Sequence, residues 1–110
     1  MKNISTISHQ NINKTNLYFT RKEFTKILNY YSLGVAKGNW RDYSLNFTKY
    51  EAYFHFYKNA SEKPSISIIK NKSNKKNFRV YYGFREPLFS NKLENLFSYI
   101  NRKNIKLIKR

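Results

Sequence analysis

The chain has 110 residues, no cysteine, and 22 Lys plus Arg against 6 Asp plus Glu, which gives a formal net charge of +16. Its length fits one domain, and the lack of cysteine excludes disulfides and thiolate metal sites, so stability must come from apolar packing. The charge predicts a polyanionic partner, because AT-rich coding accounts for many lysines but not for so few acids.

The first residues, "MKNISTISHQNINKTN", are polar and rich in Asn and Ser. They contain neither the apolar run of a secretory signal nor the arginines of a mitochondrial transit peptide. We expect residues 1–16 to form a disordered arm and residues 17–110 a single α+β domain. No segment approaches the length of about 20 apolar residues that spans a membrane, so we expect a cytoplasmic protein without a membrane partner.

Residues 21–36 are predicted to form a helix. Thr20 is a good N-cap, Glu23 completes a capping box, and Phe19 can contact Phe24 across the helix start. An apolar stripe with helical spacing follows, formed by Phe24, Ile27, Leu28, Tyr31 and Val35.

After Gly38 the apolar period changes from that of a helix to that of a strand. Residues 43–47 and 50–58 are expected to pair as antiparallel strands, with "FTKY" as the tight connection between them, and residues 65–70 and 78–82 give two more. Between the last two lies "KNKSNKKN", which has no apolar residue and is predicted to be an exposed basic hairpin loop. Its lysines are Lys70, Lys72, Lys75 and Lys76.

The C-terminal part is predicted to hold a second helix and a short strand. Ser90 is the expected cap of this helix, and its apolar stripe is Leu93, Leu96, Phe97 and Ile100. The final "NIKLIKR" alternates as a strand would. These elements predict an α+β fold in which two helices pack on one face of a four- or five-stranded, mainly antiparallel sheet, in the order α-β-β-β-β-α-β.

The sheet face away from the helices is the candidate binding surface. If Phe54 and Phe56 face the helices, alternation turns the side chains of the neighbouring residues outward. That face would carry Tyr53, His55, Tyr57, Arg79 and Tyr81. Such a surface can stack unpaired bases while cations hold phosphates. The alternative is that these tyrosines only pack across strands, which is the more common role of strand tyrosines.

The block "GNWRDY" holds the only Trp and the only Asp of the chain. Gly38 is expected to end the first helix in the left-handed conformation. Trp40 can then close the end of the core, and Asp42, beside Arg41, can accept backbone hydrogen bonds in the turn. This structural interpretation is favoured over a binding role.

The same block resembles a known family. "GNWRDY" is similar to the Gly-x-Trp-Arg-Asp-Tyr block of the uncharacterised alphaproteobacterial family called domain of unknown function 2794, and "FTRKEF" and "ASEKP" resemble its opening and its Ser-Glu-Arg-Pro segment. The resemblance spans about residues 19–108. It implies a bacterial, cytoplasmic protein and supplies no mechanism. The residues that belong to the shared pattern or to the corner that it contains are Trp40, Arg41, Asp42, Tyr43, Ser61, Glu62 and Pro64.

The residue inventory does not favour an enzyme. Besides the single Asp the chain has only two histidines, and His9 lies in the polar arm. His55 and Glu51 are on one strand face but about 13 Å apart along it, too far for a catalytic pair. No His or carboxylate spacing predicts a metal site, and no cofactor is expected.

Two hypotheses follow from these observations. The first is a non-enzymatic protein that binds a polyanion, favouring RNA, through Lys70, Lys72, Lys75, Lys76, Arg79, Tyr53, Tyr57 and Tyr81. The second is an adaptor that docks an acidic protein through its sheet edge or tyrosine face. The sequence leaves the oligomeric state open.

Overall fold

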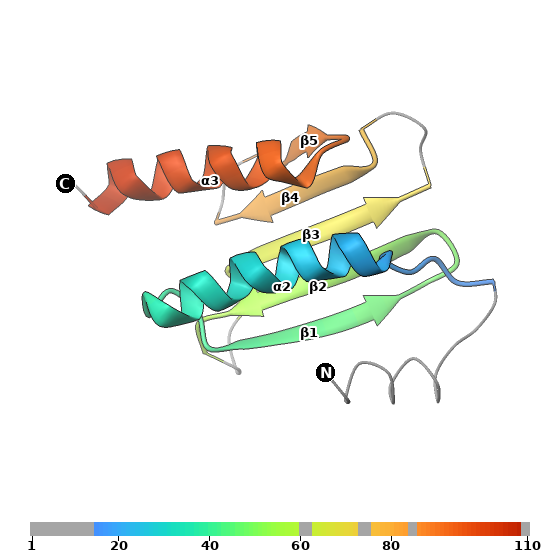
Figure 1. Cartoon of the computed structure of the whole chain (residues 1–110), viewed down its shortest axis with the longest axis horizontal. Coiled ribbons are helices and arrows are strands. Elements are labelled where there is room, and N and C mark those ends of the chain that lie inside the picture. Colours follow the sequence, from blue (N-terminus) through green and yellow to red (C-terminus); the bar gives the residue numbers. More distant parts are fainter. Residues whose placement is uncertain (1–14, 60–62, 73–75, 84–85, 109–110) are drawn as a thin grey trace.

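The computed structural model describes residues 15–59, 63–72, 76–83 and 86–108. It contains two helices, α2 (Arg21–Ala36) and α3 (Leu93–Ile108) (Figure 1). The five strands are β1 (Asp42–Phe47), β2 (Glu51–Tyr57), β3 (Ile66–Asn71), β4 (Phe78–Tyr82) and β5 (Leu88–Ser90). The arm predicted over residues 1–16 lies outside the described residues, apart from its last two.

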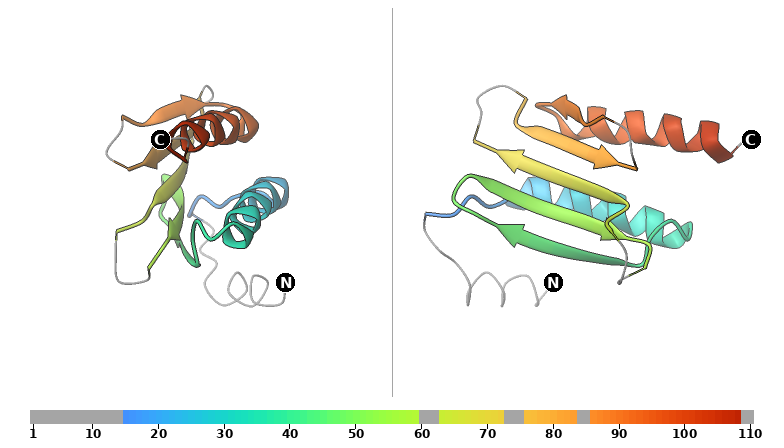
Figure 2. Two further views of the ribbon diagram at one scale, coloured as in Figure 1. Left: turned by 90° about the vertical axis from the view of Figure 1, so that its left-hand side faces the viewer. Right: turned by 180° about the vertical axis from the view of Figure 1, so that it is seen from behind.

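All five strands form one antiparallel sheet, and their order in the sheet is their order in the chain, β1-β2-β3-β4-β5. Both helices lie on the same face of this sheet, as the edge-on view in Figure 2 shows. The predicted α+β class, with two helices on one face of an antiparallel sheet, is confirmed. The element order differs at its end, because the fifth strand comes before the second helix rather than after it.

The start of α2 follows the predicted capping box. The backbone N–H of Glu23 donates to Thr20 Oγ1 at 3.1 Å, and the backbone N–H of Thr20 donates to Glu23 Oε1 at 2.8 Å. Phe19 and Phe24 flank this cap, and both rings contact Phe54 of β2, with centroid separations of 6.2 and 5.5 Å. The cap therefore fixes the first turn of α2 over the middle of the sheet.

The apolar stripe of α2 differs from the prediction in its last turn. Ile27 and Tyr31 are buried, but Val35 is 43% exposed, and Tyr30 and Gly34 are buried in addition. The reason is the indole of Trp40, which packs against the helix at Gly34 and so decides which side of the last turn is covered. The core thus continues from the helix into the segment after it.

Phe54 and Phe56 of β2 form the centre of the core, and neither has any exposed surface. Complete burial of such a side chain stabilises a fold by about 1.5–3 kcal/mol.

Both helices contribute to this cluster and touch each other. The Tyr30 ring stacks on Phe97 at 4.2 Å, and its hydroxyl donates to Asn101 Oδ1 at 3.0 Å. Burial raises the pKa of Tyr30 to about 12.

Helix α3 confirms the predicted stripe but not its predicted ends. Leu93, Leu96 and Ile100 are buried and Phe97 packs against the core. Ser90 is the last residue of β5 rather than the helix cap, and its Oγ accepts from the backbone N–H of Lys92 at 3.1 Å. The strand predicted in "NIKLIKR" is wrong, because α3 continues to Ile108.

Candidate nucleic-acid interface

The candidate site is the face of the sheet opposite the two helices, called the open face below. Strand β2 shows how it forms, because its buried residues are Ala52, Phe54 and Phe56. Its partly exposed residues are Glu51, Tyr53, His55 and Tyr57. The structure therefore places the two predicted tyrosines and the histidine on the open face, as strand alternation requires.

The strand register brings the remaining predicted residues of the open face beside them. Ile69 of β3 lies opposite Tyr53 on one side and Arg79 on the other. In the next row Ser67 of β3 lies opposite His55 and Tyr81. The first of these two rows, which contains Tyr53, Ile69 and Arg79, continues onto β5, where Phe89 pairs with Arg79.

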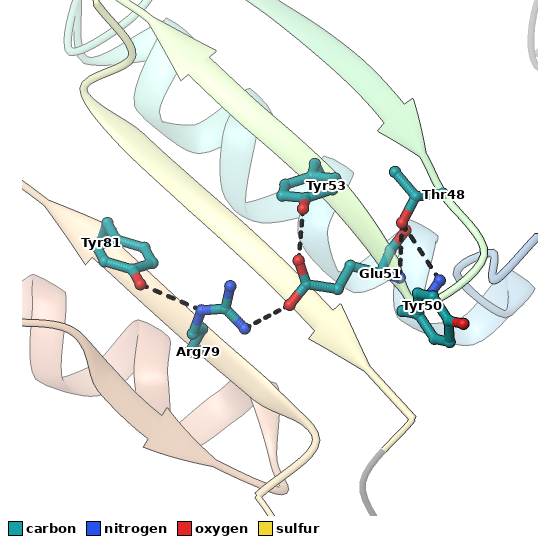
Figure 3. A network of polar contacts seen from close by, with 6 residues as sticks. All are labelled: Thr48, Tyr50, Glu51, Tyr53, Arg79 and Tyr81. Atoms are coloured by element: carbon teal, nitrogen blue, oxygen red, sulfur yellow. Dashed lines mark hydrogen bonds and ion pairs between the residues drawn. The ribbon is translucent and has the colours of Figure 1, made fainter.

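A carboxylate joins three of these side chains into one network (Figure 3). Glu51 Oε2 accepts from Arg79 Nη1 at 2.8 Å, and Glu51 Oε1 accepts from the Tyr53 hydroxyl. Arg79 Nε in turn donates to the Tyr81 hydroxyl at 3.3 Å. Since β3 lies between β2 and β4, this network joins β2 to β4 across β3 on the open face. Sequence reasoning missed Glu51 as a member, although its parity with Tyr53 indicated the same face.

The network changes the acid–base properties of its members. The hydrogen bond from Arg79, and then that from Tyr53, hold the pKa of Glu51 below its ordinary value. The bond to Glu51 raises the pKa of the Tyr53 hydroxyl. The pair of Glu51 and Arg79 is therefore charged at neutral pH, with the positive charge of Arg79 largely compensated. Arg79 holds the network in place rather than offering a free cation.

His55 lies between the two other open-face rings of β2. Its imidazole stacks on Tyr53 at 5.9 Å with planes inclined by 23°, and Tyr57 lies 6.3 Å away. His55 Nδ1 is 2.7 Å from Ser67 Oγ. Burial lowers the pKa of His55, so the neutral imidazole is the form at neutral pH. The Tyr57 hydroxyl is 2.9 Å from Ser44 Oγ on β1.

Lys70 corrects the prediction of an exposed basic loop. It is a residue of β3 on the helix side and is only 8% exposed. Its Nζ forms an ion pair with Glu23 Oε1 at 2.7 Å and donates to the backbone carbonyl of Tyr18 at 2.9 Å. The physical reason is parity, since Lys70 lies two and four residues after Ile68 and Ile66, which are also buried. Lys70 therefore cannot contact a ligand.

Two other lysines of that loop, Lys72 and Lys76, lie at the end of the β3–β4 hairpin. The hairpin closes where the backbone N–H of Asn71 donates to the carbonyl of Asn77 at 2.8 Å. Lys76 follows the loop with a left-handed φ of 26° and is exposed, as is Lys72. Lys75 lies outside the described residues. The exposed loop lysines that the structure describes are thus Lys72 and Lys76, and Lys70 is not one of them.

An aromatic residue that the sequence analysis did not single out lies at the same end of the sheet. Tyr50, in the turn between β1 and β2, is 64% exposed. The Nζ atoms of Lys49 and Lys72 are 5.7 and 5.9 Å from its ring centroid. "FTKY" indicated a tight turn, and the signal that could have revealed Tyr50 is a large ring in a turn beside lysine.

The corner that follows α2 is a structural element. Trp40 is 4% exposed, and its indole N–H donates to the backbone carbonyl of Tyr31 at 2.7 Å. Gly38 has a φ of 79°, the left-handed conformation expected at the helix end. Asp42 Oδ1 accepts from the backbone N–H of Tyr43 at 2.8 Å. Trp40 and Asp42 thus do what the packing interpretation predicted.

The positions of the other residues of the shared family pattern say less about their roles. Tyr43 faces the helices, where its ring contacts Tyr31 at 5.1 Å. The backbone N–H of Arg41 pairs with the carbonyl of Tyr57, and its side chain is exposed. Pro64 precedes β3, and Ser61 and Glu62 lie outside the described residues.

Two further properties concern the described part of the chain alone. No group of three His, Asp or Glu side chains in it could hold a metal ion. Neither α2 nor α3 is long and apolar enough to cross a membrane.

The fold and the open face together describe a small basic α+β protein with an aromatic sheet surface. The model of a family described as protein of unknown function (DUF2794) matches residues 17–86, so the chain belongs to this family. The match includes α2 and β1 to β4 and ends before β5 and α3, short of the end at about residue 108 that the sequence resemblance predicted. No curated protein and no solved structure matches the chain.

Proposed function

We propose that this protein is a non-enzymatic, cytoplasmic binder of single-stranded nucleic acid, and of RNA in particular. The observation that carries the proposal is the group of open-face side chains formed by Tyr53, His55, Tyr57 and Tyr81, on the sheet face that α2 and α3 leave free. Lys72 and Lys76 lie at the hairpin end of the same sheet. A single nucleic-acid strand that runs along β2 could thus stack its bases on these rings and place phosphates at the lysines of that end.

The physical basis of the proposal is that aromatic rings bind bases and cations bind phosphates. A base stacked on an aromatic side chain contributes about 1–3 kcal/mol, and any base can stack, so the binding is expected to be largely independent of sequence. The net charge of +16 adds a long-range attraction to polyanions. Glu51 limits phosphate binding beside Arg79, because it compensates the charge of that side chain. Phosphates are therefore expected along the rim, at the hairpin lysines.

The test is a titration of a fluorescent single-stranded RNA with the purified chain at several salt concentrations. Each phosphate contact to a single strand contributes a slope of about 0.7 in the logarithm of affinity against the logarithm of salt concentration. The variant Lys72→Ala with Lys76→Ala removes two contacts and should reduce the slope by about 1.4.

The matched control is Lys37→Ala with Lys58→Ala, which removes the same charge from exposed lysines at the opposite end of the sheet. The slope should change much less in this control. Equal slopes in both double variants would show attraction by net charge alone. An RNA affinity that is absent at low salt would end the proposal. Recovery from cells of a stoichiometric acidic protein that survives nuclease would favour the adaptor function instead.

A further inference from the structure

We propose that Tyr50 is the first base-stacking position of this protein and that Lys49 and Lys72 hold the phosphates beside that base. The inference rests on the proposed function and makes it specific, because it names an unpaired nucleotide as the ligand and the β1–β2 turn as its place of binding. It assigns the open-face tyrosines a secondary role.

The backbone under Tyr50 is held by a dense set of hydrogen bonds centred on Thr48 (Figure 3). Thr48 Oγ1 accepts from the backbone N–H of Tyr50 at 3.3 Å and from that of Glu51 at 3.0 Å. The backbone N–H of Thr48 donates to the Glu51 carbonyl at 2.8 Å, and the Thr48 carbonyl accepts from Leu17 at 2.9 Å. The turn is therefore ordered before a ligand arrives, which lowers the entropic cost of binding.

The two lysines that contact the Tyr50 ring come from different hairpins. Lys49 belongs to the β1–β2 turn and Lys72 follows β3, and both ammonium groups lie within 6 Å of the ring centroid, at 5.7 and 5.9 Å. An exposed cation–π contact of this kind changes an affinity by only about two- to fivefold. Stacking of one base on an aromatic ring changes it by about five- to a hundredfold. A base should thus displace a lysine from the ring and leave its charge for a phosphate.

The open-face tyrosines differ in this respect, because the cation beside the Tyr81 ring, Arg79 at 5.7 Å, is already paired with Glu51. The hydroxyl of Tyr53 is bonded to Glu51, and its ring already stacks on His55. A nucleotide above that ring would meet the compensated pair of Glu51 and Arg79 rather than a free cation. Tyr50 has cations beside it instead, and its ring is mostly exposed to solvent. The nucleic-acid strand should consequently bind at the β1–β2 turn first and extend over the open face afterwards.

The experiment uses the full-length chain with Tyr50→Trp as a fluorescent reporter. The native Trp40 is 4% exposed and hydrogen-bonded inside the core, so base stacking at position 50 should be seen as quenching of the new, exposed indole. The probes are an oligoadenylate and the same strand annealed to its oligouridine complement. We expect quenching with the single strand, and little with the duplex, in which both faces of each base are covered.

Affinity measurements with Tyr50→Ala and Tyr50→Phe complete the test. The first should bind oligoadenylate about tenfold more weakly, and the second should bind as the wild type does, because the ring and not the hydroxyl makes the contact. Leu33→Ala, which shortens a comparably exposed side chain on α2, is the control and should leave affinity unchanged. The thermal unfolding of all variants should match the wild type.

Each outcome separates this inference from the proposed function. If the wild type binds RNA and Tyr50→Ala binds equally well, the inference is overturned and the proposed function stands. Equal quenching by duplex and single strand also overturns it, because stacking requires an unpaired base. If the wild type binds neither probe at low salt, the proposed function itself fails.

Discussion

A single glycine in α2 shows how a local sequence choice serves the core. Gly34 lies in the last turn of α2, and the indole of Trp40 lies directly against it. A Cβ built at position 34 would come within 2.1 Å of Trp40 Cε2. The indole N–H also depends on this close approach for its bond to Tyr31. The pair of Gly34 and Trp40 therefore determines how the chain leaves α2 for β1.

Gly34→Ala should destabilise the fold. Alanine favours the helix by about 1 kcal/mol over glycine, but overpacking a core contact costs about 1–3 kcal/mol and often more when a rigid ring must move. We expect a net loss of about 1–2 kcal/mol in the free energy of unfolding, measured by urea denaturation with circular dichroism. A red shift of the Trp40 fluorescence should accompany it. A stabilised variant would contradict the contact.

His55 is the residue through which stability should respond to mild acid. Burial lowers its pKa in the folded chain below the ordinary value of 6.5, so the unfolded chain takes up a proton at a higher pH than the folded chain. The contribution of the neutral imidazole is thus fully present above pH 6.5 and is lost as the pH falls toward the folded pKa. His55→Gln lacks this titration.

The measurement compares the free energy of unfolding of the wild type and His55→Gln between about pH 8 and about pH 5, which brackets the ordinary pKa of histidine. The wild type should lose stability relative to the variant across the lower part of this range. Parallel curves would show that His55 titrates equally in the folded and unfolded chains.

At the scale of elements, β3 ties the start of α2 to the sheet through a charged pair. The side chains of Lys70 and Glu23 are only 11% and 21% exposed, and Lys70 also bonds to the carbonyl of Tyr18. Loss of one partner leaves the other partly buried without its opposite charge, which is costly in a protein interior. The same glutamate completes the capping box, so one side chain serves both helix and sheet.

Lys70→Met should lower the free energy of unfolding by about 2–3 kcal/mol, somewhat less than the loss of a fully buried partner. Adding Glu23→Gln should recover part of this loss, because glutamine removes the unpaired charge and can still complete the cap. The two single variants and the double variant form a cycle measured by urea denaturation. Strictly additive effects would show that the two side chains do not interact.

The elements that the sequence predicted best are those with redundant signals. The helix from residue 21 to residue 36 has a cap, a staple and a stripe, and α2 has these bounds. Lys70 was misplaced because composition grouped it with the loop lysines, while strand parity with Ile66 and Ile68 grouped it with the core. The C-terminal "NIKLIKR" fits a strand by alternation, yet a helix already begun at Leu93 extends through it more easily than a new strand can start.

At the scale of the molecule, the sequence predicted which face of the sheet is open but not how its side chains pair. Alternation alone places Tyr53, His55 and Tyr57 on that face. The bond from Arg79 to Glu51 crosses β3 and depends on register, which no short segment of sequence specifies. The contact of Lys72 with the Tyr50 ring likewise depends on the ends of two hairpins lying side by side. Charge composition therefore predicted a polyanionic partner, whereas a candidate surface for it could be proposed only from the arrangement of the side chains in the fold.

The order of strands in the sheet has a consequence for how the protein is made. Because each strand after β1 pairs with the strand before it, its partner has already left the ribosome when it emerges. No early strand has to wait, with its edge exposed, for a distant segment of the chain. Helix α3 follows the strands in the chain and contacts β4 and β5, so this part of the core can close only after α3 has emerged.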